Sequence, residues 1–272
     1  MTLTTLRLSD PDLTVAYRDS GSGSGEPLVL IHGVGMQSAA WEPQIAALSG
    51  KWRVIALDMP GHGGSTPLPE GSELPDFVAW LHAVVQALDL APINLAGHSM
   101  GALIAAGFAA SFPSLTRRVA LLNGVYHRDA AARRAVQARA QEIRAGQIDL
   151  DTPLARWFGD TPAEITAKAQ VATWLGKVDL SGYATAYTAF ANGDATYADQ
   201  LPQIACPLLA MTGDDDPNST TAMSAAMASL ARQGTAVAIT GHRHMINLTA
   251  AREVNAHLLT WLKQPATQKE LQ

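Results

Sequence analysis

Residues 97–101 read Gly-His-Ser-Met-Gly, and this spacing of a serine between two glycines constrains the fold more than any other feature. A mostly apolar run, residues 93–96, precedes the motif, and an alanine-rich segment typical of a helix follows it. At so sharp a turn from strand to helix, the residues two before and two after the serine must be very small. The pattern therefore predicts Ser99 as a nucleophile, although a bare motif of this kind also occurs as a simple packing turn.

A second apolar run, residues 28–31, is typical of a strand buried on both faces, and it ends at His32-Gly-Val-Gly. A nucleophilic serine needs nearby donors for the oxyanion that forms on the attacked carbonyl. One donor is expected to be the backbone N–H of Met100, the residue after the serine. We assign the second to Val34, in the loop after the earlier strand, and expect His32 to pack inside that loop.

The chain resembles the α/β-hydrolase family in four segments read in order: residues 32–35, 41–44, 53–65 and 97–101. The stretch from 41 to 65 is most similar to carboxylesterases and 3-oxoadipate enol-lactonases. The resemblance implies an α/β fold with a mostly parallel central sheet, helices on both faces and an inserted helical cap. A serine at position 99 disfavours epoxide hydrolase and haloalkane dehalogenase chemistry, because those branches place an aspartate there.

The order of catalytic residues in this family, serine, acid, histidine, places both partners after Ser99. A buried strand expected over residues 208–212 opens into Gly213-Asp-Asp-Asp-Pro, a turn crowded with carboxylates. The family pattern of glycine, two residues and aspartate selects Asp216 as the acid. Asp214 is the alternative within what would otherwise be a solvated polar loop.

Two histidines follow the next expected strand, residues 236–240. The methionine and the asparagine-leucine pair that come after them select His244 as the catalytic position, with His242 as the alternative. The family usually has glycine directly before this histidine, whereas this chain has Arg243. His242 and His244 also have the types of metal ligands, but no third ligand with suitable spacing accompanies them. We therefore expect neither a metal nor any other cofactor.

Alternating strand and helix patterns predict a mostly parallel sheet covered on both faces, and the resemblance implies that residues 1–125 and 198–272 form the hydrolase core. Strand patterns are missing from residues 126–197, where helices are expected over 130–145, 162–175 and 183–192. The family inserts its cap at this place, and such a lid shapes the pocket and excludes water. The aromatic residues of this segment include Trp157, Phe158, Trp174, Tyr183, Tyr187 and Phe190.

The expected cap also carries a basic cluster that few acids relieve. One of its arginines is suited to bind a substrate carboxylate with two parallel hydrogen bonds. The alternative is a solvated helix face, which is the usual place for a run of charges. The cluster consists of Arg128, Arg133, Arg134, Arg139 and Arg144.

Composition favours an ordinary enzyme that acts on a small molecule. The 272 residues carry a net charge of −5, which leaves no electrostatic footprint for nucleic acid. No run approaches a membrane span, and the first residues lack the pattern of a secretory signal. The single cysteine, Cys206, permits no internal disulfide. We therefore predict a cytoplasmic protein without nucleic-acid or membrane partners, and leave its oligomeric state open.

Together these features favour a serine hydrolase that cleaves a small carboxylic ester or lactone through an acyl-enzyme. A second possibility uses the same triad to hydrolyse a carbon–carbon bond in a ring-fission diketone, although members of that branch often carry asparagine where this chain has His98. Hydrolysis of an amide or an acylated enamine stands beside it. A third possibility is a receptor that has kept the triad and senses a ligand through the cap.

Overall fold

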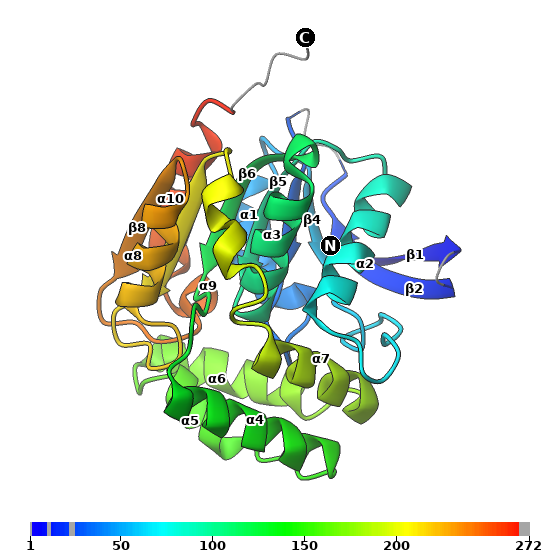
Figure 1. Cartoon of the computed structure of the whole chain (residues 1–272), viewed down its shortest axis with the longest axis vertical. Helices are drawn as coiled ribbons and strands as arrows, with labels where there is room; N and C mark the ends of the chain where they lie inside the picture. Colours follow the sequence, from blue (N-terminus) through cyan, green and yellow to red (C-terminus); the bar gives the residue numbers. More distant parts are fainter. Residues whose placement is uncertain (1, 10–11, 22–24, 267–272) are drawn as a thin grey trace.

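The computed structural model describes residues 2–9, 12–21 and 25–266, and within them eight strands form one sheet (Figure 1). The strand order is β1-β2-β4-β3-β5-β6-β7-β8. β2 pairs antiparallel with both β1 and β4, and every pairing from β4 to β8 is parallel. The strands are β1 (Leu3–Ser9), β2 (Asp12–Asp19), β3 (Leu28–Ile31), β4 (Val54–Leu57), β5 (Ile93–His98), β6 (Thr116–Leu122), β7 (Leu208–Gly213) and β8 (Gly234–Ile239).

Both faces of the central strands are buried, as their continuous apolar runs predict. Successive side chains of a strand point to opposite faces, and in β3 Leu28 and Leu30 join one hydrophobic cluster while Val29 and Ile31 join the other. The prediction of a mostly parallel sheet with helices on both faces is confirmed.

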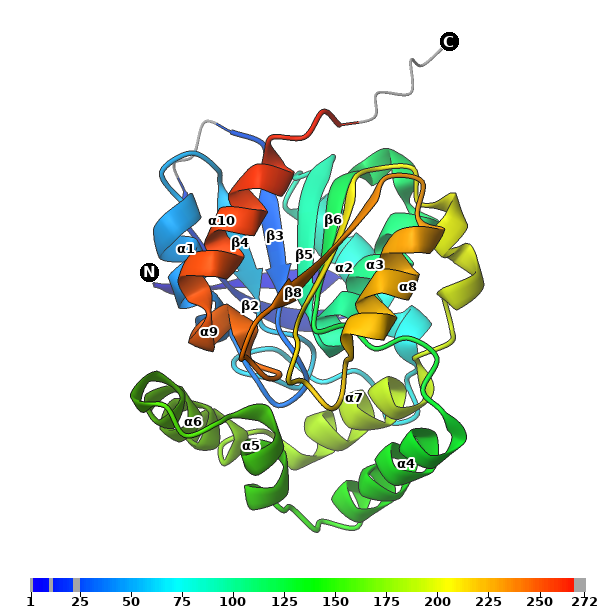
Figure 2. The same ribbon diagram turned by 90° about the vertical axis from the view of Figure 1, so that its left-hand side faces the viewer.

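The helices divide between these two faces (Figure 2). α1 (Glu42–Leu48), α9 (Ile246–Thr249) and α10 (Ala251–Leu262) cover one face, and α2 (Leu74–Ala87), α3 (Met100–Ser111) and α8 (Thr221–Leu230) cover the other. Short 3-10 helices span Ser38–Trp41, Pro113–Leu115 and Ala198–Gln203.

Residues 126–197 form a layer of helices beyond the carboxyl end of the parallel strands (Figures 1 and 2). The layer touches the loops that follow the strands, because Gly182 packs directly against Gly61 and Leu175 lies against Gly35. Its helices are α4 (Ala130–Arg144), α5 (Asp151–Trp157), α6 (Pro162–Leu175) and α7 (Leu180–Asn192).

Some elements differ from the sequence-based expectation. β1 was not predicted, because an edge strand with mostly exposed side chains carries no buried apolar run. α5 was not predicted either, because it has only 7 residues and its N-cap, Leu150, makes no side-chain capping bond. α7 begins three residues before Tyr183, at Leu180, where Asp179 caps it. No helix in the described ranges is both long and apolar enough to cross a membrane.

Candidate active site

Ser99 stands at the turn between β5 and α3, as the spacing of the glycines predicts. Its backbone has φ 54° and ψ −115°, in a region that L-residues seldom adopt. A Cβ on Gly97 would overlap the carbonyl oxygen of Gly101, and one on Gly101 would overlap that of Ile31. The Ser99 N–H donates to Leu122 O on β6 at 2.8 Å, so the neighbouring strand also fixes the turn.

The predicted acid and histidine lie side by side. His244 Nδ1 is 2.7 Å from Asp216 Oδ2, and the two side chains are 5% and 0% exposed. Because a carboxylate accepts, Nδ1 carries the proton and Nε2 is left as the acceptor. Asp216 comes from the loop after β7 and His244 from the loop after β8, and β5, which precedes Ser99, belongs to the same parallel set. The three residues therefore all follow the carboxyl ends of parallel strands, where open α/β sheets bind ligands.

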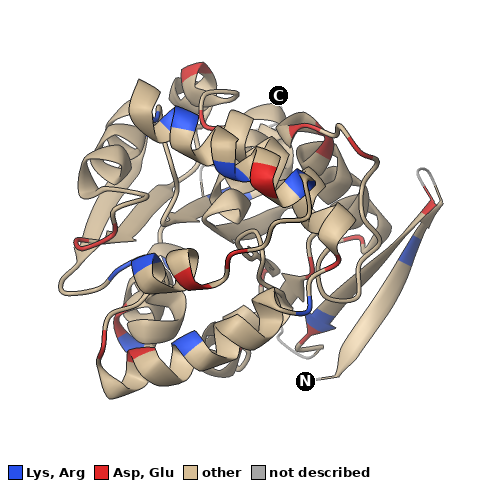
Figure 3. Ribbon diagram, turned by 90° about the horizontal axis from the view of Figure 1, so that it is seen from below, with Lys and Arg blue, Asp and Glu red and all other residues tan. Residues whose placement is uncertain are grey.

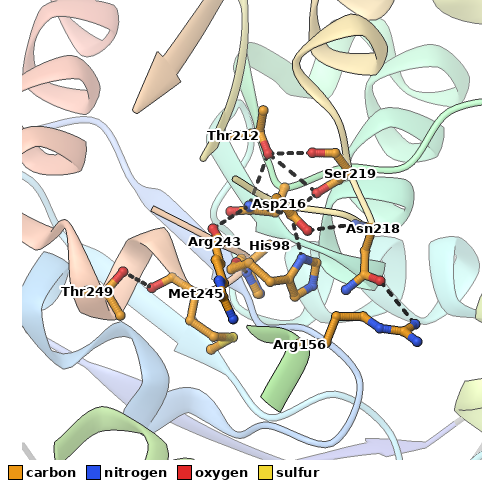
Figure 4. Close-up of polar contacts among 11 residues, drawn as sticks. His98, Arg156, Thr212, Asp216, Asn218, Ser219, Arg243, Met245 and Thr249 are labelled. Carbon is orange, nitrogen blue, oxygen red and sulfur yellow. Dashed lines mark hydrogen bonds and ion pairs between the residues drawn. The ribbon is translucent and has the colours of Figure 1, made fainter. Parts of the chain in front are cut away.

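Three further donors hold the Asp216 carboxylate, and two of them, Asn218 and Ser219, are labelled in Figure 4. Asn123 Nδ2 donates to Oδ2 at 2.8 Å, the Asn218 N–H donates to Oδ1 at 2.8 Å, and the Ser219 hydroxyl donates to Oδ2. Burial raises the pKa of this carboxyl, but the adjacent His244 and the bonds from Ser219 and Asn218 outweigh burial and hold the pKa well below its usual range. The carboxylate is therefore charged at neutral pH.

The alternative acid and histidine do not meet in this way. Asp214 is exposed, and its Oδ1 accepts the N–H of Gly241 at 2.7 Å. His242 is half-buried, with Nδ1 3.0 Å from the Thr249 hydroxyl oxygen. Across the described ranges, no three His, Cys, Asp or Glu side chains are grouped so that they could hold a metal ion.

The two residues predicted to supply oxyanion donors flank the elbow. Met100 is the first residue of α3, and the loop that contains Val34 lies against Ser99, because a Cβ at Gly33 would be only 3.0 Å from the Ser99 Cβ. Among the hydrogen bonds formed within residues 2–9, 12–21 and 25–266, none uses the N–H of Val34 or of Met100. Both groups are thus available as donors.

Two buried histidines form hydrogen bonds that hold the loop containing Val34. His32 donates from Nδ1 to Gly33 O at 2.7 Å and accepts the Met59 N–H at Nε2 at 2.9 Å. His62 donates from Nδ1 to Pro60 O at 3.0 Å and accepts the Gly35 N–H at Nε2 at 2.8 Å. Each ring uses one donor and one acceptor, which only the neutral form offers. His32 thus packs inside the loop, as expected from the sequence.

A third histidine, His98, connects the elbow to the His244 loop. Its Nε2 donates to the carbonyl oxygen of His244 at 2.8 Å, and the two rings have centroids 5.0 Å apart. Burial, followed by the proximity of His244, lowers the pKa of His98 to about 3. His98 is therefore neutral, and its proton resides on Nε2.

The helical layer also contacts the His244 side chain and the loop that carries it. The Trp157 indole at the end of α5 stacks on the His244 imidazole, with ring centroids 5.8 Å apart and an angle of 28° between the planes. Arg243, the residue directly before His244, donates hydrogen bonds to the carbonyl oxygens of Ala155 and Phe158.

The arginines of the basic cluster have different surroundings. Arg128 is buried, pairs with Asp194 at 3.3 Å and lies over the Phe190 ring, while Arg133 reaches the same carboxylate at 3.2 Å. Arg134 is exposed, as the solvated-face alternative expects. The acids that pair with these arginines include Asp194, within the same segment, and Glu70, which pairs with Arg144 from elsewhere in the chain. Figure 3, viewed from below, shows basic and acidic residues interspersed on the ribbon.

Three polar residues of the site escaped the sequence analysis: Asn123, Ser219 and His98 in its role as a donor. Asn123 directly follows β6, and its φ of 48° aims a buried amide at Asp216. The available signal was its position, because a polar residue at the carboxyl end of a parallel strand lies close to the ends of its neighbours.

Comparisons with known proteins identify relatives of this chain. A family model described as "alpha/beta hydrolase fold" matches residues 26–146. The chain is 52% identical over 259 residues to the (E)-2-((N-methylformamido)methylene)succinate hydrolase of Acinetobacter baylyi, a match that covers 95% of this chain and 97% of that protein. It is 29% identical over 225 residues to 3-oxoadipate enol-lactonase 2 of the same organism, covering 79% and 80%. A crystal structure of the enol-lactonase from Burkholderia xenovorans matches with a TM-score of 0.86 at 26% identity, covering 96% of this chain and 100% of that one. The chain therefore belongs to the α/β-hydrolase family and is a hydrolase.

Proposed function

We propose that Ser99, His244 and Asp216 form a catalytic triad that hydrolyses an acyl bond of a small molecule. The observation that carries the proposal is the buried Asp216–His244 pair, joined at 2.7 Å, at the same end of the sheet as the Ser99 elbow. Asp216 fixes the tautomer that leaves His244 Nε2 free to accept a proton. The two unused N–H groups beside Ser99 supply the oxyanion hole.

The reaction proceeds through an acyl-enzyme. Ser99 Oγ attacks the substrate carbonyl carbon and passes its proton to His244, while Asp216 stabilises the imidazolium. The N–H groups of Met100 and Val34 hold the oxyanion, and the loss of one such donor typically costs about a hundredfold or more in rate. His244 then protonates the leaving group, and a water molecule releases the acyl group by the same route.

For the substrate, we propose a small dicarboxylate that carries an N-acylated enamine, cleaved at its amide bond. The relative at 52% identity bears the name of a hydrolase of an N-methylformamido-methylene succinate. Burial raises the pKa of the half-buried Tyr187, and the charges of Arg139, Arg128 and Arg156 act against that rise. Helices α4–α7 would then act as a cap, in which Arg139 of α4 and Arg156 of α5 attract carboxylates.

Hydrolysis of a small ester or lactone is the second candidate. The observation that favours it is the likeness to enol-lactonases, at 29% identity in sequence and at a TM-score of 0.86 in structure. The two candidates share the triad, the oxyanion hole and the acyl-enzyme, and they differ in the leaving group. An enamine nitrogen must be protonated as it leaves, whereas an enolate oxygen leaves readily without a proton.

One panel tests both candidates. We would measure acid release from acylated enamine dicarboxylates, enol-lactones, aryl esters and ring-fission diketones with the unaltered protein, with Ser99→Ala and with the matched control Ser114→Ala, a change at an exposed serine. Selective turnover of the enamines supports the first candidate, and turnover of lactones or esters supports the second. Full activity in Ser99→Ala would overturn the triad, and no turnover of any acyl class would favour a receptor.

A further inference from the structure

Helix α5 depends on other parts of the molecule for its position. It has 7 residues, and its N-cap residue, Leu150, provides no side-chain cap. A helix of this length is not stable by itself in water, because the cost of nucleation exceeds the gain from so few hydrogen bonds. Its tertiary contacts must therefore hold it where it is.

Arg243 makes a polar contact with this helix from a distant part of the chain. Its Nη1 donates to Phe158 O at 2.7 Å and to Ala155 O at 3.0 Å, at the carboxyl end of α5. The last carbonyl groups of a helix lack partners within the helix and carry partial negative charge, so a guanidinium is well suited to both. Among the ion pairs of the described ranges none includes Arg243, so its charge serves these carbonyl groups.

The same end of α5 contacts both loops of the proposed triad. Trp157 stacks on the His244 imidazole at a centroid distance of 5.8 Å. Arg156 Nη1 donates to Asn218 Oδ1 at 3.5 Å, and the N–H of Asn218 donates to Asp216 (Figure 4). The contact with Asn218 is long, whereas the two Arg243 bonds are short and charge-assisted.

We propose that Arg243 is a positioning residue, which ties α5 to the His244 loop and thereby holds the Trp157 indole against the imidazole. The indole covers one face of the ring, limits its rotation and keeps water away from it. A glycine at this position would have no side chain with which to reach the helix. The role assigned to Trp157 rests on the proposed function of His244.

The first test measures the position of α5 without any reaction. In protein labelled with 5-fluorotryptophan, the ¹⁹F signal of Trp157, assigned with Trp157→Phe, would shift or broaden in Arg243→Met. Amide exchange over residues 152–158 would be about tenfold faster, because two charge-assisted bonds to the helix are lost. Arg243→Lys, which keeps the charge but lacks the planar fork, would restore part of both effects.

Arg134→Met is the matched control, because Arg134 is an exposed arginine of the same helical layer. It would leave the Trp157 signal and the exchange of α5 as they are in the unaltered protein. If Arg243→Met left both unchanged, Arg243 would not position α5 and the inference would be overturned. If the methionine variant did not fold, Arg243→Gln, which also lacks the charge, would supply the same comparison.

The second test measures the reactivity of Ser99 with a fluorophosphonate probe. Ser99 Oγ bonds to phosphorus, fluoride leaves and the hydroxyl proton passes to His244. We expect the second-order labelling rate of Arg243→Met to fall about tenfold, as for a lost positioning contact, with partial recovery in Arg243→Lys. An unchanged rate alongside a displaced α5 would overturn the positioning role. If the unaltered protein were labelled no faster than Ser99→Ala, the proposed triad itself would fail, whereas the ¹⁹F and exchange results would still report on the contact.

Discussion

The imidazole of His98 donates from Nε2 to the backbone carbonyl of His244, at 2.8 Å. The residue next to the elbow serine therefore holds the main chain of the histidine expected to act on that serine. The two residues lie 146 positions apart in sequence, so the bond joins the loop after β8 to the last residue of β5. It is buried, where a lost hydrogen bond is costly.

His98→Ala should both destabilise the protein and lower its rate of acyl turnover. The variant leaves a buried carbonyl without its donor, and we expect the free energy of unfolding to fall by about 1–3 kcal/mol. Acyl turnover should fall as well, because the His244 loop loses an anchor. Denaturant unfolding and initial rates measure the two effects. Stability and activity equal to those of the unaltered protein would show that the bond has no role.

Asn123→Ala should remove one of the hydrogen bonds that position the Asp216 carboxylate. Asn123 Nδ2 donates to Asp216 Oδ2 at 2.8 Å and to the Thr212 hydroxyl oxygen at 3.1 Å. Without this donor the carboxylate keeps His244, Ser219 and Asn218, so we expect a loss of about tenfold in kcat/KM and not its abolition. Steady-state kinetics with a substrate identified in the panel would check this. Asn123→Asp should be worse, because it places a second carboxylate beside Asp216.

Stability should decline in mild acid through the buried histidines. Burial lowers the pKa of His62 from 6.5 to about 4. The unfolded chain then takes up this proton near its ordinary pKa while the folded chain does not, so the stabilisation is complete above pH 6.5 and is lost as the pH falls towards 4. Denaturant unfolding from about pH 7 to about pH 4.5 measures the slope, in a range where most carboxyl groups stay ionised.

His62→Gln supplies the comparison for that slope. Glutamine can accept the Gly35 N–H with its side-chain oxygen but does not titrate. The variant should therefore show a shallower loss of stability between those pH values. An identical slope in both proteins would assign the acid sensitivity to other groups, such as His32 or His98.

Cys206 should be inert in the folded protein. It is buried and free, and burial raises the pKa of its thiol to about 11. Because the thiolate is the reactive form, an aromatic disulfide reagent at neutral pH should react only as the chain unfolds. The rate of thiol release with and without denaturant measures this, and rapid reaction of the native protein would contradict it. Cys206 is the only cysteine in the sequence, so the signal has one source.

Much of the fold followed from local pattern. The apolar run at 28–31 can be satisfied only by a strand with both faces covered, and the glycines around Ser99 only by a tight turn between strand and helix. The short α5 and the edge strand β1 were not predicted, because their stability comes from neighbouring elements and not from their own sequences.

Part of the candidate site could also be predicted from sequence patterns. The expected order along the chain limited the acid to the loop after β7 and the histidine to the loop after β8. Within those loops, the family pattern selected Asp216 and His244, and the structure brings these two side chains within 2.7 Å of each other. Their roles in a reaction stay a prediction.

The sequence by itself determined the turn at Ser99, the buried strands and the order of serine, acid and histidine along the chain. Backbone sterics and hydrophobic periodicity act over only a few residues, so a short stretch of sequence reveals them. Only the tertiary structure decided that Asn123 holds Asp216, that His98 holds His244 and that Arg243 holds α5. Each of these contacts joins positions at least 85 residues apart. Such contacts depend on how strands and loops meet at one edge of the sheet, which no short stretch of sequence specifies.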